Sequence, residues 1–124
     1  MAAAWAGFLI AVALLTTGAA LFNHYVVRIR RAHRWLSRGA VLVDVDSPSL
    51  FARRHPRGAV SLPLDALQGQ ANEALKDAPA VVVFAHSWRS GARAVHELRR
   101  SGFANVTNAA GLHTLRSLEL AQRE

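Results

Sequence analysis

The chain has 124 residues, a formal net charge of +7 and no cysteine. The missing cysteine excludes disulfide bonds, thiolate catalysis and cysteine-ligated zinc or iron–sulfur sites, and it suits a reducing compartment. The length allows one domain of about 90 to 100 residues once an apolar N-terminal segment is set aside.

That apolar segment follows the first methionine. From Ala2 to Phe22 only two threonines interrupt a run of apolar or small residues, and no charged side chain occurs before Arg28. As a helix the segment spans about 31 Å, close to the hydrocarbon thickness of a bilayer. A buried core helix seldom runs so long without a charge, and a cleaved signal peptide usually carries a basic residue before its apolar part. We therefore predict a transmembrane helix over residues 1–27.

A basic juxtamembrane segment, residues 28–38, comes next. Its arginines are a third of the Lys and Arg residues of the chain: Arg28, Arg30, Arg31, Arg34 and Arg38. By the positive-inside rule they predict a single-pass protein of the cell membrane with a cytoplasmic C-terminal domain, export by a cleaved or uncleaved signal being the alternative. Anionic lipid headgroups explain this charge, so nucleic acid is not an expected partner. Trp35 is either an interfacial anchor or the first core residue of the next domain.

Short strands and helices alternate over the remaining residues, 39–124. Strands are predicted over residues 40–45, 58–64, 81–83 and 105–109. Helices are predicted from Pro48 to Pro56, over 64–78, over 91–100 and from Gly111 through Leu112, Leu115 and Leu118. Ser47 is the expected N-cap of the first of these helices, and Val60 and Leu62 are expected to face one way. The order predicts an α/β domain, a parallel sheet flanked by helices on both faces.

The segment from Val81 to Ala94, VVVFAHSWRSGARA, predicts an anion-binding loop. The turn from Ala85 to Ser90 follows a buried strand and opens onto a helix that we expect to begin at Gly91. Parallel α/β proteins bind anions at such turns, because backbone N–H groups and the helix dipole favour negative charge. Enzymes that use this arrangement for sulfur or phosphate chemistry place a cysteine thiolate at the first loop position. Here that position is Ala85.

The order and spacing of these motifs resemble the rhodanese-like family over about residues 41–118. The matching residues of the first half are Asp44, Val45, His55, Gly58, Ala59, Leu62 and Pro63. The second half matches through the loop, the helix, Gly102, Phe103, Asn105, Val106 and Gly111, and its NAAGL ending is similar to small phage-shock rhodaneses. The resemblance implies the rhodanese-like fold and a sulfurtransferase that carries sulfane sulfur as a persulfide on the loop cysteine.

The departures from the family pattern lie in the chemistry. Ala85 occupies the nucleophile position, and Trp88 stands where the family usually has glycine. Ser90 takes a position often held by a substrate-pairing arginine, although the neighbouring Arg89 offers a substitute, and Asp46 replaces the arginine that commonly follows the Asp-Val pair. Since serine is un-ionised at neutral pH without a dedicated base, neighbours cannot replace the thiolate. We therefore expect no sulfurtransferase activity.

The loop remains a candidate anion-binding or partner-binding site, with these residues: His86, Ser87, Trp88, Arg89, Ser90 and Gly91. We expect Asp44 to support the loop by accepting backbone N–H bonds, and Trp88 either to fill the pocket or to stand exposed as a protein contact. A nucleophilic histidine or serine is disfavoured, because the loop holds no carboxylate to orient the histidine. The scattered histidines predict no metal site, and no cofactor is expected.

Three functions remain open at this point. The first is an inactive binding or regulatory module at the membrane surface, which recognises a protein or a small anion. The second is a sulfurtransferase-related enzyme that works by a non-family residue or with a partner's cysteine. The third is a lipid-sensing anchor in which the arginine segment matters most.

Overall fold

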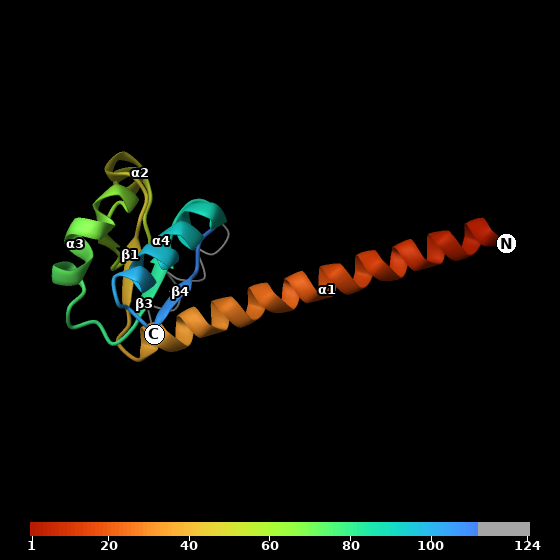
Figure 1. Ribbon diagram of the computed structural model, residues 1–124, viewed down its shortest axis with the longest axis horizontal. Coiled ribbons are helices and arrows are strands. Elements are labelled where there is room, and N and C mark those ends of the chain that lie inside the picture. The colour runs from red at the N-terminus through yellow and green to blue at the C-terminus, as the bar shows by residue number, and fades with distance from the viewer. Residues whose placement is uncertain (112–124) are drawn as a thin grey trace.

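A long N-terminal helix leads into a small α/β domain in the computed structural model, which describes residues 1–111 (Figure 1). Helix α1 runs from Ala2 to Ser37, and its N-terminal part projects away from the domain. Among the described residues it is the one helix that is long and apolar enough, by length and composition, to cross a membrane. At about 1.5 Å per residue it measures about 54 Å, so it extends well beyond the thickness of a bilayer core.

The domain is built on a four-stranded parallel sheet with the strand order β2-β1-β3-β4. The strands are β1 (Val41–Asp44), β2 (Val60–Ser61), β3 (Val81–Phe84) and β4 (Val106–Asn108). The register pairs Val43 with Val60 and with Val83, and Val83 with Asn108. All four residues of β3 are buried, as expected for a central parallel strand covered on both faces.

Four helical segments of the domain connect these strands: α2 (Pro48–Arg53), the 3₁₀ turn η1 (Leu64–Ala66), α3 (Leu67–Ala74) and α4 (Trp88–Arg100). Ser47 caps α2 as predicted, since its side chain accepts a hydrogen bond from the Leu50 N–H. The helix predicted over residues 64–78 is a 3₁₀ turn followed by a shorter α-helix. Helix α4 begins at Trp88, three residues before the predicted start, because the Ser87 side chain caps it there.

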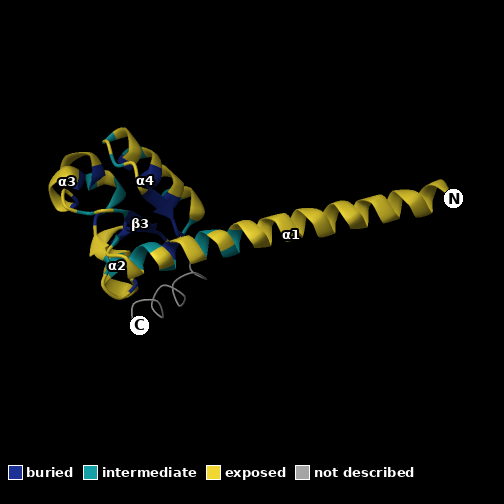
Figure 2. Cartoon of the chain, turned by 90° about the horizontal axis from the view of Figure 1, so that it is seen from below, coloured by how far each residue is buried: buried dark blue, intermediate teal, exposed yellow. Residues whose placement is uncertain are grey.

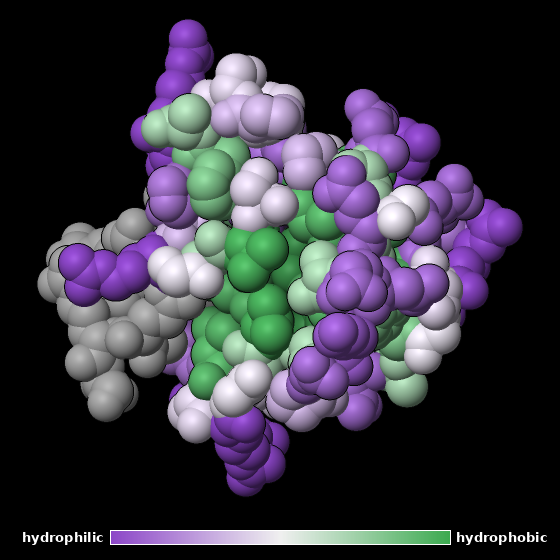
Figure 3. Space-filling model, turned by 90° about the vertical axis from the view of Figure 1, so that its left-hand side faces the viewer, coloured by the Kyte–Doolittle hydropathy of each residue, from purple (hydrophilic) through white to green (hydrophobic). Residues whose placement is uncertain are grey.

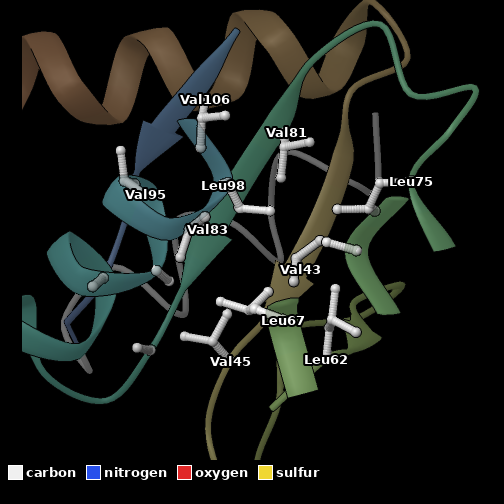
Figure 4. Packing of buried hydrophobic residues seen from close by; sticks show 14 residues of the cluster. Val43, Val45, Leu62, Leu67, Leu75, Val81, Val83, Val95, Leu98 and Val106 are labelled. Atoms are coloured by element: carbon white, nitrogen blue, oxygen red, sulfur yellow. The ribbon is translucent and has the colours of Figure 1, made fainter. Parts of the chain in front are cut away.

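The main hydrophobic core lies between the sheet and helices α3 and α4 (Figure 4). Val43 and Val83 point from the central strands toward Leu67 of α3 and Leu98 of α4. Leu62 also belongs to this core, but Val60 is 41 % exposed. The prediction that these two residues of the extended segment face one way is therefore wrong, because β2 is a two-residue edge strand that ends before Leu62.

The opposite face of the sheet is covered by the C-terminal end of α1 (Figure 2). Ala32 is fully buried there against Leu42, Val82 and Phe84, and Trp35 packs against the same cluster. The small Ala32 side chain permits this close approach of helix and sheet. The basic segment 28–38 is thus largely a continuation of α1 that contributes to the domain, and Trp35 is a core-packing residue.

The domain face turned away from the N-terminal half of α1 shows an apolar area bordered by hydrophilic side chains (Figure 3). Besides Trp88, the exposed large hydrophobic residues in the described part of the domain are Leu50 on α2 and Val60 on β2. The helix predicted from Gly111 onward falls on residues 112–124, outside the described residues.

Candidate functional site

The candidate loop lies at the carboxyl edge of the two central strands, where β1 and β3 end side by side. The Val45 N–H donates to the Phe84 carbonyl, and the Gly111 N–H donates to the Ala85 carbonyl. These bonds hold the residues after β1, β3 and β4 at one edge of the sheet. Ala85 itself is fully buried at this edge.

Asp46 and His86 form the closest polar contact of the loop. Both carboxylate oxygens of Asp46 accept from the His86 backbone N–H, at 3.1 and 3.2 Å. The Oδ1 atom also lies 2.6 Å from Nδ1 of the His86 ring. Asp46 is buried, whereas half of the His86 side chain is exposed. The loop itself holds no carboxylate, but Asp46 orients this histidine from the end of the neighbouring strand, a contact that the sequence did not predict.

The Asp46 carboxylate changes what the loop can bind. The carboxylate accepts a hydrogen bond from the first backbone N–H after Ala85, and N–H groups of this kind stabilise an anion in such a turn. A second negative charge brought to this edge would be repelled by Asp46, and burial reduces the screening of that repulsion. The His86 N–H is thus already hydrogen-bonded within the protein.

Asp44 accepts a backbone N–H bond, as predicted, but among the described hydrogen bonds the donor is Asp46 and not a residue of the loop after β3. Its Oδ1 accepts from the Asp46 N–H at 2.9 Å, and its Oδ2 is buried without a hydrogen-bond partner among the described residues. Burial raises the pKa of Asp44 to about 6, opposed by the hydrogen bond from Asp46. Asp44 orders the turn that carries Asp46, and Asp46 holds the loop.

The raised pKa of Asp44 predicts a pH-dependent stability. The Asp44 carboxyl holds its proton more tightly in the folded state than in the unfolded state. Its contribution to the free energy of unfolding is therefore highest below about pH 4 and falls as the pH rises toward about 6. In Asp44→Asn this fall, about 2 to 3 kcal/mol in size, should disappear while an acceptor for the Asp46 N–H remains. Denaturant titrations of both proteins at pH 4 and pH 7 measure the change in the free energy of unfolding between the two pH values. An equal change in the wild-type chain and in Asp44→Asn would contradict the prediction.

The two serines of the loop serve the start of α4. The Ser87 hydroxyl accepts from the Ser90 N–H at 3.2 Å and donates to the Ser90 hydroxyl at 3.0 Å. Within the described contacts neither hydroxyl is bonded to His86, so the geometry assembles no serine nucleophile. Gly91 lies inside the helix and is buried, and a Cβ there would overlap Oδ1 of Asn108. Its role in the structure is close packing of α4 on β4.

Trp88 turns toward α1. The Arg28 guanidinium lies over its ring at 4.1 Å from the centroid, and the His24 ring meets it edge to face at 6.5 Å. The indole remains 48 % exposed. Trp88 is therefore exposed, the second of the two expected outcomes, and it joins the loop to the N-terminal helix by a cation–π contact. Arg89, the next residue, is exposed.

A comparison with protein families matches residues 29–111 to the rhodanese-like domain, more than half of the chain. The chain belongs to the rhodanese-like domain family. The match begins inside α1, in agreement with the packing of the end of that helix on the sheet of this rhodanese-like domain. A search of curated proteins finds no match.

Solved structures of rhodanese-like domains share the fold. A rhodanese from E. coli, described with anions, is 28 % identical, with 60 % of this chain and 88 % of that chain covered and a TM-score of 0.56. A Rhodanese_3 like domain from Anabaena sp is 25 % identical, with 63 % and 91 % covered and a TM-score of 0.58. A Helicobacter pylori protein at 15 % identity, with 65 % and 74 % covered and a TM-score of 0.54, shows the fold alone.

This rhodanese-like domain lacks the group that the family's persulfide chemistry needs, because the chain contains no cysteine. No cluster of three or more His, Asp or Glu side chains within residues 1–111 is arranged to hold a metal ion. Asp46 stands out in the sequence as a departure from the family pattern, but its contact with His86 was not predicted. Its position two residues beyond Asp44, at the end of a strand adjacent to β3, was the signal that could have identified it.

Proposed function

We propose that this chain is a membrane-anchored rhodanese-like module that does not transfer sulfur and acts in binding or regulation at the membrane surface. The observation that carries the proposal is the paired change at the loop: Ala85 replaces the nucleophile, and the buried Asp46 carboxylate occupies the loop N–H of His86. The E. coli rhodanese is described with anions, whereas here a carboxylate of the protein itself takes the loop donor.

Membrane attachment is supported by the exposed apolar half of α1 and by the arginines that follow it. The positive-inside rule favours a cytoplasmic domain. A C-terminal fusion of alkaline phosphatase, active only after export, tests this orientation in cells, and a fusion of green fluorescent protein serves as the matched control. An active phosphatase fusion would reverse the orientation.

A protein partner is the ligand that the outer side of the loop suits best. His86 and Arg89 are exposed there, and Trp88 adds an aromatic surface that is half accessible. Aromatic and arginine side chains are enriched at the centres of protein interfaces.

The test of the proposal is sulfur transfer from thiosulfate to cyanide by the purified full chain in detergent. A cysteine-containing rhodanese in the same detergent is the positive control. We expect thiocyanate to form at the rate of buffer alone, because no thiolate is present. Turnover above that rate, in protein free of contaminating rhodanese, would overturn the proposal.

The Asp46–His86 pair supports a second candidate, an enzyme that uses a non-family residue. A buried carboxylate 2.6 Å from a half-exposed imidazole orients the ring as a general base requires. Hydrolysis of p-nitrophenyl acetate by the full chain, lost in His86→Gln and retained in the distant His96→Gln, would favour this candidate over the binding module.

A further inference from the structure

A cavity of about 390 Å³ lies between α1, α4 and the edge strand β4, away from the Asp46–His86 pair. One face of α1 forms its first wall, through His24, Val27, Arg28 and Arg31 at helical spacing. Helix α4 supplies the opposite wall and β4 the floor. The volume falls within the range of small-ligand sites.

The polar groups of this cavity favour negative charge. Arg28, Arg31 and Arg99 line it together with His24 and His96, and none of the twelve lining residues within the described range 1–111 is a carboxylate. Glu97 of α4 lies beside Arg100 at 3.8 Å and lines a different depression. The described wall of the cavity therefore gathers three arginines with no carboxylate among its residues.

Among the arginines of the cavity, Arg28 is the one with buried guanidinium nitrogens that lack a hydrogen-bond acceptor in the described structure. Its Nε and Nη1 atoms are buried without a hydrogen-bond partner among the described residues, while the Trp88 ring covers one face of the guanidinium. Arg99, by contrast, donates from Nη2 to the Val106 carbonyl at 3.4 Å. Buried guanidinium nitrogens without an acceptor are unfavourable unless an anion joins them, and Arg28, of intermediate exposure, has two of them.

Part of the cavity lining is apolar, and this bears on which class of anion the cavity can bind. Val27, Val95 and the Trp88 ring lie among the cationic groups. The α1 wall begins at His24, two residues after the apolar segment Ala2–Phe22 ends. In a membrane-attached chain this places the cavity at the level of lipid headgroups.

We propose that the α1–α4 cavity binds a phosphate group, with Arg28 and Arg31 as its principal ligands and Arg99 in support. Guanidinium groups match phosphate oxygens in geometry and charge. The phosphate belongs either to an anionic lipid headgroup or to a soluble phosphate compound. Only the lipid source rests on the proposed membrane attachment, and neither source depends on the chemistry of Ala85.

Two pairs of variants distinguish phosphate binding in the cavity from nonspecific electrostatic attraction to the basic helix. Arg28→Gln/Arg31→Gln removes two charges from the cavity. Arg30→Gln/Arg34→Gln removes two charges from the same helix at exposed positions that do not line it. Because Arg28 also contacts Trp88, a second matched pair leaves α1 intact: Arg99→Gln in the cavity wall and Arg100→Gln beside it.

The lipid arm uses native mass spectrometry of the full chain in micelles with equal amounts of phosphatidylcholine and phosphatidylglycerol. We expect one retained phosphatidylglycerol, reduced at least fivefold in Arg28→Gln/Arg31→Gln and at least threefold in Arg99→Gln. Arg30→Gln/Arg34→Gln and Arg100→Gln should retain it.

The soluble arm titrates the full chain in phosphatidylcholine nanodiscs with inorganic phosphate and follows the Trp88 indole N–H resonance. If the Trp88 resonance shifts saturably with phosphate and the shift is lost only in the cavity variants, the ligand is a soluble phosphate compound. If phosphatidylglycerol is retained without such a shift, the ligand is a lipid headgroup. Equal losses in the cavity variants and their controls, or no binding of either probe by the wild-type chain, would overturn the proposal.

Discussion

Gly91→Ala is expected to lower the free energy of unfolding of the domain by about 3 kcal/mol. A Cβ at this position would overlap Oδ1 of Asn108 and come within 2.5 Å of the Ala110 Cβ. Neither neighbour can yield easily, because the Asn108 Oδ1 accepts from the Ala110 N–H at 2.9 Å and both residues are buried. Denaturant titration of the full chain in detergent measures the loss.

The matched control is Gly69→Ala. Gly69 also lies inside a helix, α3, but a Cβ there meets nothing within 4 Å. Alanine has the higher helix propensity, so this change should leave stability unchanged or raise it by up to about 1 kcal/mol. If both variants unfold at the same denaturant concentration, α4 does not pack on β4 as closely as the structure places it.

Restoring the cysteine alone is expected to leave sulfur transfer near background. In Ala85→Cys the thiol would sit at a fully buried position, next to the backbone N–H that Asp46 occupies. Burial and the Asp46 charge both oppose thiolate formation and the approach of thiosulfate. We expect a rate of thiocyanate formation within about twofold of the wild-type chain.

Ala85→Cys/Asp46→Asn is the informative companion. Asparagine keeps an oxygen that accepts from the His86 N–H and removes the negative charge. Sulfur transfer by the double variant should exceed that of Ala85→Cys at least tenfold. Full activity of Ala85→Cys by itself would show that the missing nucleophile is the whole difference from an active rhodanese.

The fold was predictable from sequence because its signals are local. Buried β-branched runs separated by helical spacing and by Gly or Pro specify parallel strands with crossover helices. The packing of α1 on the sheet was less accessible, since the arginines of residues 28–38 dominate that segment. Its buried side is a narrow stripe around Ala32 and Trp35, and only the tertiary structure shows that this stripe meets the sheet.

The position of the loop in the fold was predicted from the sequence, but the contact between Asp46 and His86 was not. Ala85 and the loop lie where the strand pattern places them, at the carboxyl edge of the central strands. Asp46 and His86 are 40 residues apart, and no local pattern reveals their pairing. The start of α4 was misplaced although Ser87 is a strong capping residue, because the expected start followed Gly91, a residue that the structure uses for packing.

The pKa of the thiol in Ala85→Cys tests the central claim most directly, namely that this loop no longer stabilises an anion. The chain has no other cysteine, so the pH dependence of iodoacetamide alkylation reports this thiol alone. We predict a thiol pKa above the ordinary value for cysteine, lowered when Asp46→Asn is added. A thiol in Ala85→Cys that is already ionised at neutral pH would show an intact anion cradle and would contradict the account.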